Sequence, residues 1–183
     1  MKSQSRKFAV LPLVAAMAIA LSGCGGSSSS SSGSVTLSGT AVDGYLVGSE
    51  VCVDDNADGV VDAGETCTAS ATDATGDFSV TATATAPVII RGGSDATTGL
   101  VFEGELTAPA GSTMITPLTT VMQALMLSES DPKSEADALA AVQAMFNLGA
   151  TDITAVDPMS DVNLYARSVI AHTVMERISE SVA

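Results

Sequence analysis

The chain has 183 residues, among them 21 Asp or Glu, seven Lys or Arg and one His, so its formal net charge at pH 7 is −14. This balance excludes nucleic acid as an expected partner, because phosphate binding needs clustered Lys and Arg. Aromatic residues make up only 3% of the chain and Trp is absent, which argues against a platform that stacks on sugars.

Residues 1–23 have the features of a bacterial lipoprotein signal peptide. Three basic residues within the first seven positions precede the apolar stretch 8–21, which is too short to span a membrane comfortably. The stretch ends in Leu-Ser-Gly-Cys, which resembles the lipobox of bacterial lipoproteins. The resemblance implies a lipid on Cys24 and a place in the cell envelope, and Gly25 in place of Asp implies the outer membrane. The alternative is an ordinary secretory signal that is cleaved elsewhere.

Residues 24–34 are predicted to be a tether between the lipid and the folded part. They are almost entirely Gly and Ser, with six consecutive serines at 27–32. Such a segment has almost no apolar surface to bury, so we expect a flexible spacer. Without residues 1–23 the chain keeps four of its seven Lys or Arg and all 21 acidic residues, a formal charge of −17 that suits divalent cations.

Residues 35–109 are predicted to form a small antiparallel β-sandwich. Short stretches rich in β-branched residues alternate with turns that contain Gly and Asp. The clearest expected strands lie at 35–42, 50–53, 77–81, 88–90 and 100–106. Five or six short strands separated by turn signals favour a sandwich.

The stretch 54–65, Asp-Asp-Asn-Ala-Asp-Gly-Val-Val-Asp-Ala-Gly-Glu, matches the calcium-loop pattern D-x-[DN]-x-[DN]-G-x5-E without a gap. Calcium takes about six to eight hard oxygen ligands. The predicted ligands are five side chains and one backbone carbonyl, from Asp54, Asn56, Asp58, Asp62 and Glu65, and from Val60. Gly59 permits the sharp turn, and without a cation the carboxylates would repel one another. The sequence therefore predicts a bound Ca²⁺, and the alternative is a solvated acidic turn.

The loop resembles the calcium loops of EF-hands and of dockerins. It departs from the EF-hand in its flanks, because 51–53 and 66–68 are predicted to be extended and not helical. We therefore expect a rigid structural site and no opening switch of the sensor type. Cys52 and Cys67 flank the loop, and two cysteines in an oxidising compartment are expected to pair. The alternative is two separate buried thiols.

Two stretches, 38–51 and 72–80, resemble the carboxypeptidase-regulatory-like or Cna-B-like sandwich through their glycine-containing pattern. The resemblance covers about residues 35–90 and implies a stalk, an adhesin module or an accessory domain. Some of these families carry Lys–Asn cross-links. Lys133 is the one lysine after residue 23 and lies outside the predicted sandwich, so no such link is expected.

Residues 110–183 are predicted to be a helical region, which makes the fold class α+β. Pairs in which a capping residue precedes Pro predict helix starts at 116–117 and 131–132, and a third such pair, 157–158, closes the linker before the last helix. The apolar pattern continues up to the last residue, which leaves open that the chain is a truncated form of a longer protein. Gly149 is expected to follow the end of the second helix.

No catalytic pattern is found in the sequence, and we do not expect an enzyme. The single histidine, His172, has no partner motif and is interpreted as a surface or half-buried helical residue. The leading hypothesis is a membrane-anchored, surface-exposed, calcium-binding structural or adhesion-type lipoprotein module that contacts polysaccharide or a cell-surface protein. The alternative is the N-terminal accessory part of a longer secreted hydrolase.

Overall fold

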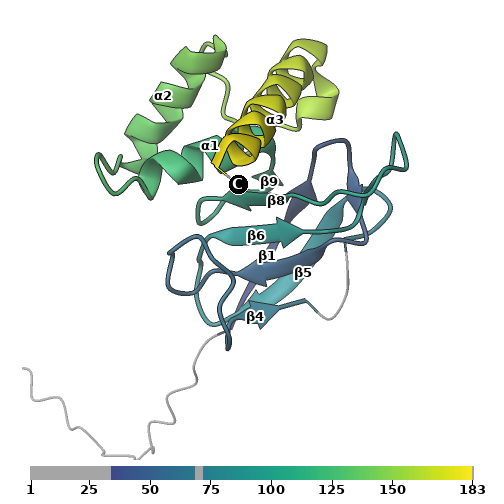
Figure 1. The fold of residues 1–183 in the computed structure, drawn as a ribbon. Helices are drawn as coiled ribbons and strands as arrows, with labels where there is room; N and C mark the ends of the chain where they lie inside the picture. The colour runs from purple at the N-terminus through teal and green to yellow at the C-terminus, as the bar shows by residue number, and fades with distance from the viewer. Residues whose placement is uncertain (1–33, 69–71, 183) are drawn as a thin grey trace, which may run out of the picture. The chain divides into compact units, whose positions relative to one another are not determined.

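The computed structural model describes residues 34–68 and 72–182, with side chains up to residue 178. The predicted signal peptide 1–23, the lipidation site Cys24 and the tether up to residue 33 lie outside the described residues. The described part has the predicted α+β fold, in which the strands come first and the α-helices follow (Figure 1). Within it, no helix combines the length and the apolar character that crossing a membrane requires.

The strands form two larger sheets and one short ribbon. The first sheet has the order β5-β1-β9, with β5 at Asp77–Ala82, β1 at Val35–Ala41 and β9 at Met114–Ile115. The second has the order β4-β3-β6-β8, with β4 at Thr66–Cys67, β3 at Glu50–Val53, β6 at Val88–Arg91 and β8 at Glu105–Ala108. The ribbon pairs β2 (Leu46–Val47) with β7 (Ser94–Asp95). These pairs are antiparallel, as predicted, except β1 with β9.

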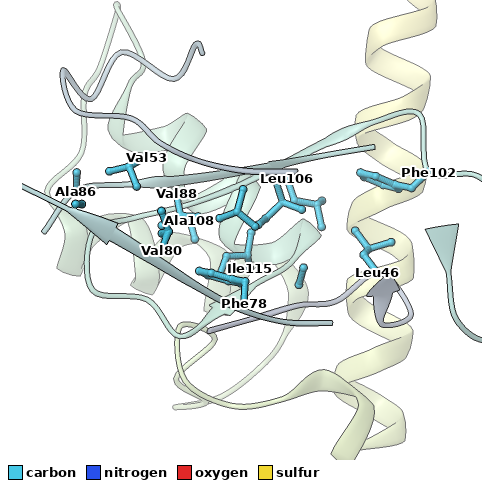
Figure 2. Packing of buried hydrophobic residues seen from close by; sticks show 14 residues of the cluster. Leu46, Val53, Phe78, Val80, Ala86, Val88, Phe102, Leu106, Ala108 and Ile115 are labelled. Carbon is cyan, nitrogen blue, oxygen red and sulfur yellow. The ribbon is translucent and has the colours of Figure 1, made fainter. Parts of the chain in front are cut away.

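The two larger sheets share one apolar core (Figure 2). In β5 every second side chain is buried, namely Phe78, Val80 and Ala82. The second sheet contributes its own alternate row, which consists of Val51, Val53, Val88, Ile90, Leu106 and Ala108. Because successive side chains of a strand point to opposite faces, this alternation turns one apolar row of each sheet inward. The β part is therefore the small sandwich that the sequence predicts.

The last strand lies beyond residue 109, which was the predicted end of the sandwich. In β9, Met114 and Ile115 are the parallel partners of Thr40 and Ala41. Ile115 is fully buried in the core of the sandwich. The region 110–183 thus begins with a strand, because the unpaired edge of β1 offers backbone partners that are distant in the sequence.

The helical layer consists of α1 (Pro117–Met126), α2 (Glu135–Phe146) and α3 (Val162–Val182), with a short 3-10 helix, η1 (Pro158–Ser160), before α3. α1 begins as predicted, with Thr116 as its N-cap and Pro117 in the first turn. The prediction for α2 was wrong, since its N-cap is Ser134 and not Asp131. The Ser134 hydroxyl accepts a hydrogen bond from the backbone N–H of Asp137 at 3.2 Å.

The start of α1 is fixed to the outer edge of the second sheet. Thr119 and Thr120 both donate hydrogen bonds from their hydroxyl groups to the carbonyl of Thr107 in β8, at 3.0 and 3.3 Å. The backbone N–H of Thr107 donates in return to the Thr120 hydroxyl at 3.0 Å. Beyond this contact the helices share a second apolar cluster, to which Met122, Val142 and other buried residues belong. The position of α1 matters for the acidic loop, which lies beside its other end.

Candidate metal site in the acidic loop

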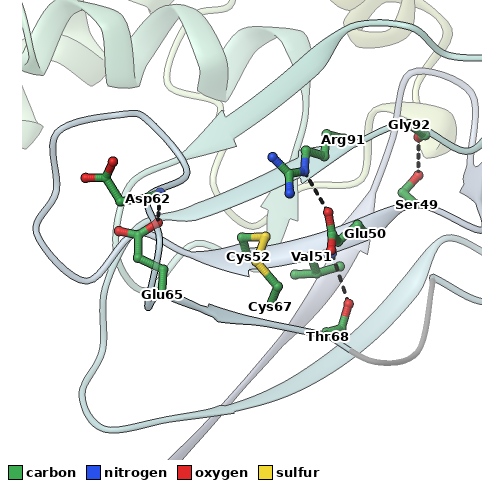
Figure 3. Close-up of polar contacts among 10 residues, drawn as sticks. All are labelled: Ser49, Glu50, Val51, Cys52, Asp62, Glu65, Cys67, Thr68, Arg91 and Gly92. Carbon is green, nitrogen blue, oxygen red and sulfur yellow. Dashed lines mark hydrogen bonds and ion pairs between the residues drawn. A yellow bond between two sulfur atoms is a disulfide. The ribbon is translucent and has the colours of Figure 1, made fainter.

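The acidic loop, residues 54–65, connects the antiparallel strands β3 and β4. Val53 and Thr66 are partners across the two strands, so the loop starts and ends at neighbouring points. The next pair, Cys52 and Cys67, forms a disulfide, as predicted (Figure 3). Both flanks are extended, so the predicted absence of the EF-hand helices is confirmed. The ends of the loop are therefore held by two backbone strands and one covalent bond.

Asp54, the first predicted ligand, is a fully buried carboxylate. One of its oxygens accepts a hydrogen bond from the N–H of Asp58 at 3.1 Å, and the other accepts from the N–H of Gly59 at 2.8 Å. Among the described residues, none of the ion pairs includes a carboxylate of the acidic loop. A buried carboxylate without a cationic partner is costly, since burial removes it from water.

Glu65, the last predicted ligand, bridges the two halves of the loop. Its carboxylate accepts from the N–H of Asp55 at 3.1 Å with one oxygen. The other oxygen accepts from the N–H of Asp62 at 2.9 Å (Figure 3). The first and the twelfth positions of the pattern are thus each tied to backbone groups inside the loop, which gives the loop a defined shape.

The middle of the loop brings three more predicted ligands together. The Asn56 amide nitrogen donates to one oxygen of Asp58 at 2.9 Å and to one oxygen of Asp62 at 3.2 Å. The N–H of Val60 donates to the other Asp58 oxygen at 2.9 Å. Positions three, five and nine of the pattern therefore converge on one point, and Val60 follows in the same turn.

Gly59 is favoured by its backbone conformation, and it lies close to the side chain of Leu127. Its φ is +83°, and a Cβ at this position would lie 2.7 Å from Leu127 Cδ1, at the C-terminal end of α1. The last turn of α1 contains no basic residue. The partial negative charge of a helix C-terminus therefore adds to that of the carboxylates. Sequence reasoning missed Leu127, because no local signal shows which helix end packs against the loop.

The donor set of the loop fits a hard divalent cation. All predicted ligands present oxygen, which is the atom that Ca²⁺ prefers. Within the described residues, however, no three carboxylates of the loop have oxygens within 4.8 Å of one another. The Asn56 amide nitrogen lies between Asp58 and Asp62 instead. Rotating the Asn56 amide by 180° would put its oxygen where its nitrogen now lies and would break its hydrogen bonds to Asp58 and Asp62. A cation could then take the place of the two N–H donors.

A second arrangement of metal-binding residue types, Glu50 with Cys52 and Cys67, lies next to the loop. The two sulfur atoms are bonded to each other, and a thiolate is the form of cysteine that binds metals. Glu50 also pairs with Arg91 at 2.7 Å (Figure 3). In the disulfide form this arrangement is therefore a structural contact and not a metal site.

Comparisons with protein-family models, with curated proteins and with solved structures gave no match for this chain. A function must therefore be inferred from the residues themselves and from their arrangement around the acidic loop.

Proposed function

We propose that this chain is a lipid-anchored module displayed on the surface of a bacterial cell, whose β-sandwich is stiffened by Ca²⁺ in the acidic loop. The observation that carries the proposal is that the side chains of Asn56, Asp58 and Asp62 meet in a loop whose two strand ends are joined by a disulfide. The lipid anchor on Cys24 and the tether, 24–34, support the surface location through their sequence alone.

The charge of the acidic loop supports a cation. Four of its carboxylates belong to the ligand pattern and have no ion pair among the described residues, and the loop approaches Leu127, at the C-terminal end of α1, through Gly59. When bound, Ca²⁺ would supply two positive charges among these carboxylates. Asp54, Asn56, Asp58, Asp62 and Glu65 would hold it through side chains, and Val60 through its carbonyl.

The surroundings of the loop favour a structural role over a signalling role. A sensor needs flanking elements that change their angle when the ion binds. Here the flanks are β3 and β4, which are hydrogen-bonded and linked by the disulfide between Cys52 and Cys67. The N–H of Thr68 also donates to the carbonyl of Val51 at 2.7 Å, which extends this pairing. The proposed ion would therefore stiffen an outer hairpin of a module that contacts polysaccharide or a cell-surface protein.

The metal site is tested by calorimetric titration of Ca²⁺ into the purified chain. Asp54→Asn and Glu65→Gln each remove one charged ligand and keep the size of the side chain. We expect each to weaken binding by about tenfold or more, the lower end of the loss that changes around metal ligands cause. Asp55→Asn is the matched control, because Asp55 carries the same charge in the same loop, is exposed and occupies a position that the pattern does not use.

The outcome of this titration separates a specific site from general attraction. If Asp55→Asn weakens binding as much as Asp54→Asn does, the ion responds only to the overall charge of the loop. If the unchanged protein takes up no calcium at millimolar concentration, the proposed site does not exist.

The lipid anchor is tested by growing bacteria that express the full chain with a labelled fatty acid. We expect the label on the unchanged protein, which should be found with the membranes, and no label on Cys24→Ser. Acyl chains hold a protein to a bilayer through their apolar surface, so the variant should be released. The double variant Cys52→Ser with Cys67→Ser is the control and should keep the label. An unlabelled wild-type chain would contradict the anchor.

A further inference from the structure

The backbone of β8 points alternately toward β6 and toward the outer edge of the sheet. The N–H of Asp54 donates to the Pro87 carbonyl at 3.0 Å, which fixes where β3 and β6 bond to each other. Because the bonding direction alternates along a strand, Arg91, like Pro87, bonds toward β3 and not toward its β8 partner, Glu105. The backbone N–H and C=O groups of Glu105 therefore point outward, away from β6.

Thr107, two residues further along β8, shows the same direction and shows how the edge is covered there. Its N–H and its carbonyl both face α1, where the hydroxyl groups of Thr119 and Thr120 are their partners. Among the described residues, no such hydrogen bond covers the backbone of Glu105. The edge of β8 is thus closed by α1 at Thr107 and open at Glu105, and an open strand edge is a place where another extended chain can pair.

The open edge borders a groove between β8 and α3. A hollow of about 400 Å³ lies here, and its apolar lining consists of Phe102, Leu106 and, from α3, Met175. Phe102 lies beside α3, with its ring centre 6.2 Å from that of His172 (Figure 2). A second hollow, of about 370 Å³, shares Phe102 and continues past the exposed Leu100. Apolar surface therefore lies next to backbone groups that have no partner.

The rim of this groove is acidic. Among the described residues that line its two hollows, five carry carboxylates and none is Lys or Arg. The five are Asp43, Asp95, Glu103, Glu105 and Glu176. Burial raises the pKa of Asp43 to about 6, although His172 lowers it, and Asp95 and Glu176 raise it further. Carboxylates of the rim thus act on one another, and a positively charged ligand would relieve this repulsion.

His172 is already engaged by two of these carboxylates. Its Nδ1 lies 2.7 Å from Asp43 Oδ2, and its Nε2 lies 3.1 Å from Glu176 Oε1. Glu103 and Glu105, which lie next to the open edge, have no ion pair among the described residues. The acidic side chains beside the free backbone groups are therefore available to a ligand.

Charge decides which chain fits the groove. A second copy of this protein would bring its own Glu103 and Glu105 to the same rim, and like charges directly opposite each other on paired strands are destabilising. A basic residue opposite Glu105 would instead meet its carboxylate, because directly paired residues point to the same face. Arg91, which acts on Glu105 from β6, is held by Glu50 at 2.7 Å. The two neighbours of that basic residue would point to the face of Leu106 and should be apolar.

We infer that the groove between the open edge of β8 and α3 binds an extended peptide segment of a partner protein, in which basic residues alternate with apolar ones. The segment adds a strand at Glu105 and exchanges hydrogen bonds with its N–H and C=O groups, while its apolar side chains contact Phe102, Leu106 and Met175. The inference goes beyond the calcium-binding role and does not depend on it, because none of the residues that line the groove belongs to the acidic loop.

The probe for the groove is a fluorescently labelled peptide of alternating Lys and Val, titrated into the full chain in the presence of a chelator. We expect binding in fluorescence anisotropy, and none by a peptide of alternating Glu and Val. N-methylation of the Lys amides keeps every charge but removes the N–H groups that face Glu105, and should weaken binding by about tenfold. N-methylation of the Val amides is the matched control, because these N–H groups face away from β8, and should have little effect.

Hydrogen exchange shows where the peptide binds. The amide of Glu105 should exchange about tenfold more slowly when the peptide is bound, because it gains a hydrogen-bond acceptor. The amide of Thr107 is the internal reference, since it already donates to Thr120 at 3.0 Å, and its exchange should stay the same.

The contribution of charge is tested by Glu103→Gln together with Glu105→Gln, which should weaken binding of the Lys and Val peptide by about fivefold, as two exposed ion pairs would. Glu129→Gln together with Glu135→Gln is the control, because it removes the same charge from exposed positions outside the groove.

Four results would overturn the inference. The first is no binding of the peptide of Lys and Val, and the second is equal binding of its two N-methylated forms. The third is an equal loss in both double variants, which would indicate attraction to the overall charge alone. The fourth is protection of the Glu105 amide that rises with protein concentration in the absence of peptide, which would assign the edge to a second copy. The chelator keeps these outcomes separate from those of the calcium titration.

Discussion

Saturating calcium is expected to raise the free energy of unfolding by about 4 kcal/mol when its free concentration is about a thousandfold above the dissociation constant. The reason is that the loop has its shape only in the folded protein, where β3 and β4 hold its two ends. In the unfolded chain the same carboxylates are separated and bind weakly. Thermal or denaturant unfolding with calcium and with a chelator measures the difference.

The control for this stabilisation is a change of cation at constant ionic strength. Magnesium requires near-ideal octahedral geometry and gives up its water reluctantly, so it should stabilise less than calcium. Superimposable unfolding curves with calcium and with chelator would show that the ion does not stabilise the folded protein. Equal effects of sodium and calcium would indicate general screening of the charge of −14 and not a site.

Removal of the disulfide by Cys52→Ala with Cys67→Ala is expected to lower the free energy of unfolding by about 3 kcal/mol. The bond spans 15 residues, and closing a loop of about this length restricts the unfolded chain by that amount. Calcium affinity should also fall, because the first and last proposed ligands, Asp54 and Glu65, would no longer be attached to fixed strand ends. Denaturant unfolding and calcium titration of the same variant measure the two effects.

The unchanged protein after reduction is the matched control, because it loses the covalent bond and keeps the volume of both sulfur atoms. A variant that loses stability while its reduced parent does not would show that the cost comes from the cavity at Cys52, which is fully buried. If the variant and the reduced protein keep full calcium affinity, the disulfide does not preorganise the loop.

The acidic loop could be predicted from the sequence because its information is local. The pattern from Asp54 to Glu65 contains all of the predicted ligands and the turn residue, Gly59. The start of α1 was predicted for the same reason, since Thr116 and Pro117 act on the adjacent turn. The start of α2 was misplaced, because Asp131 precedes Pro132 but the side chain that caps the helix is that of Ser134.

Features that depend on distant parts of the chain could not be predicted in this way. β9 joins the sandwich because Ile115 fits beside Ala41 and into the core. His172 is half-buried on a helix, one of the two situations expected for it, but its partner Asp43 belongs to another element and has no pattern that points to it. The packing of Leu127 against Gly59 also joins residues that are distant in the sequence.

The sequence by itself therefore determined the α+β class, the pairing of Cys52 with Cys67 and the position of the acidic loop between two extended segments. These follow from alternation, from cysteine number and from the spacing of side chains within one short segment. Only the tertiary structure decided which helix end lies beside the loop and which carboxylates surround His172. Such contacts form when the sandwich and the helices bury their apolar surfaces together. Short-range patterns in the sequence do not predict that packing.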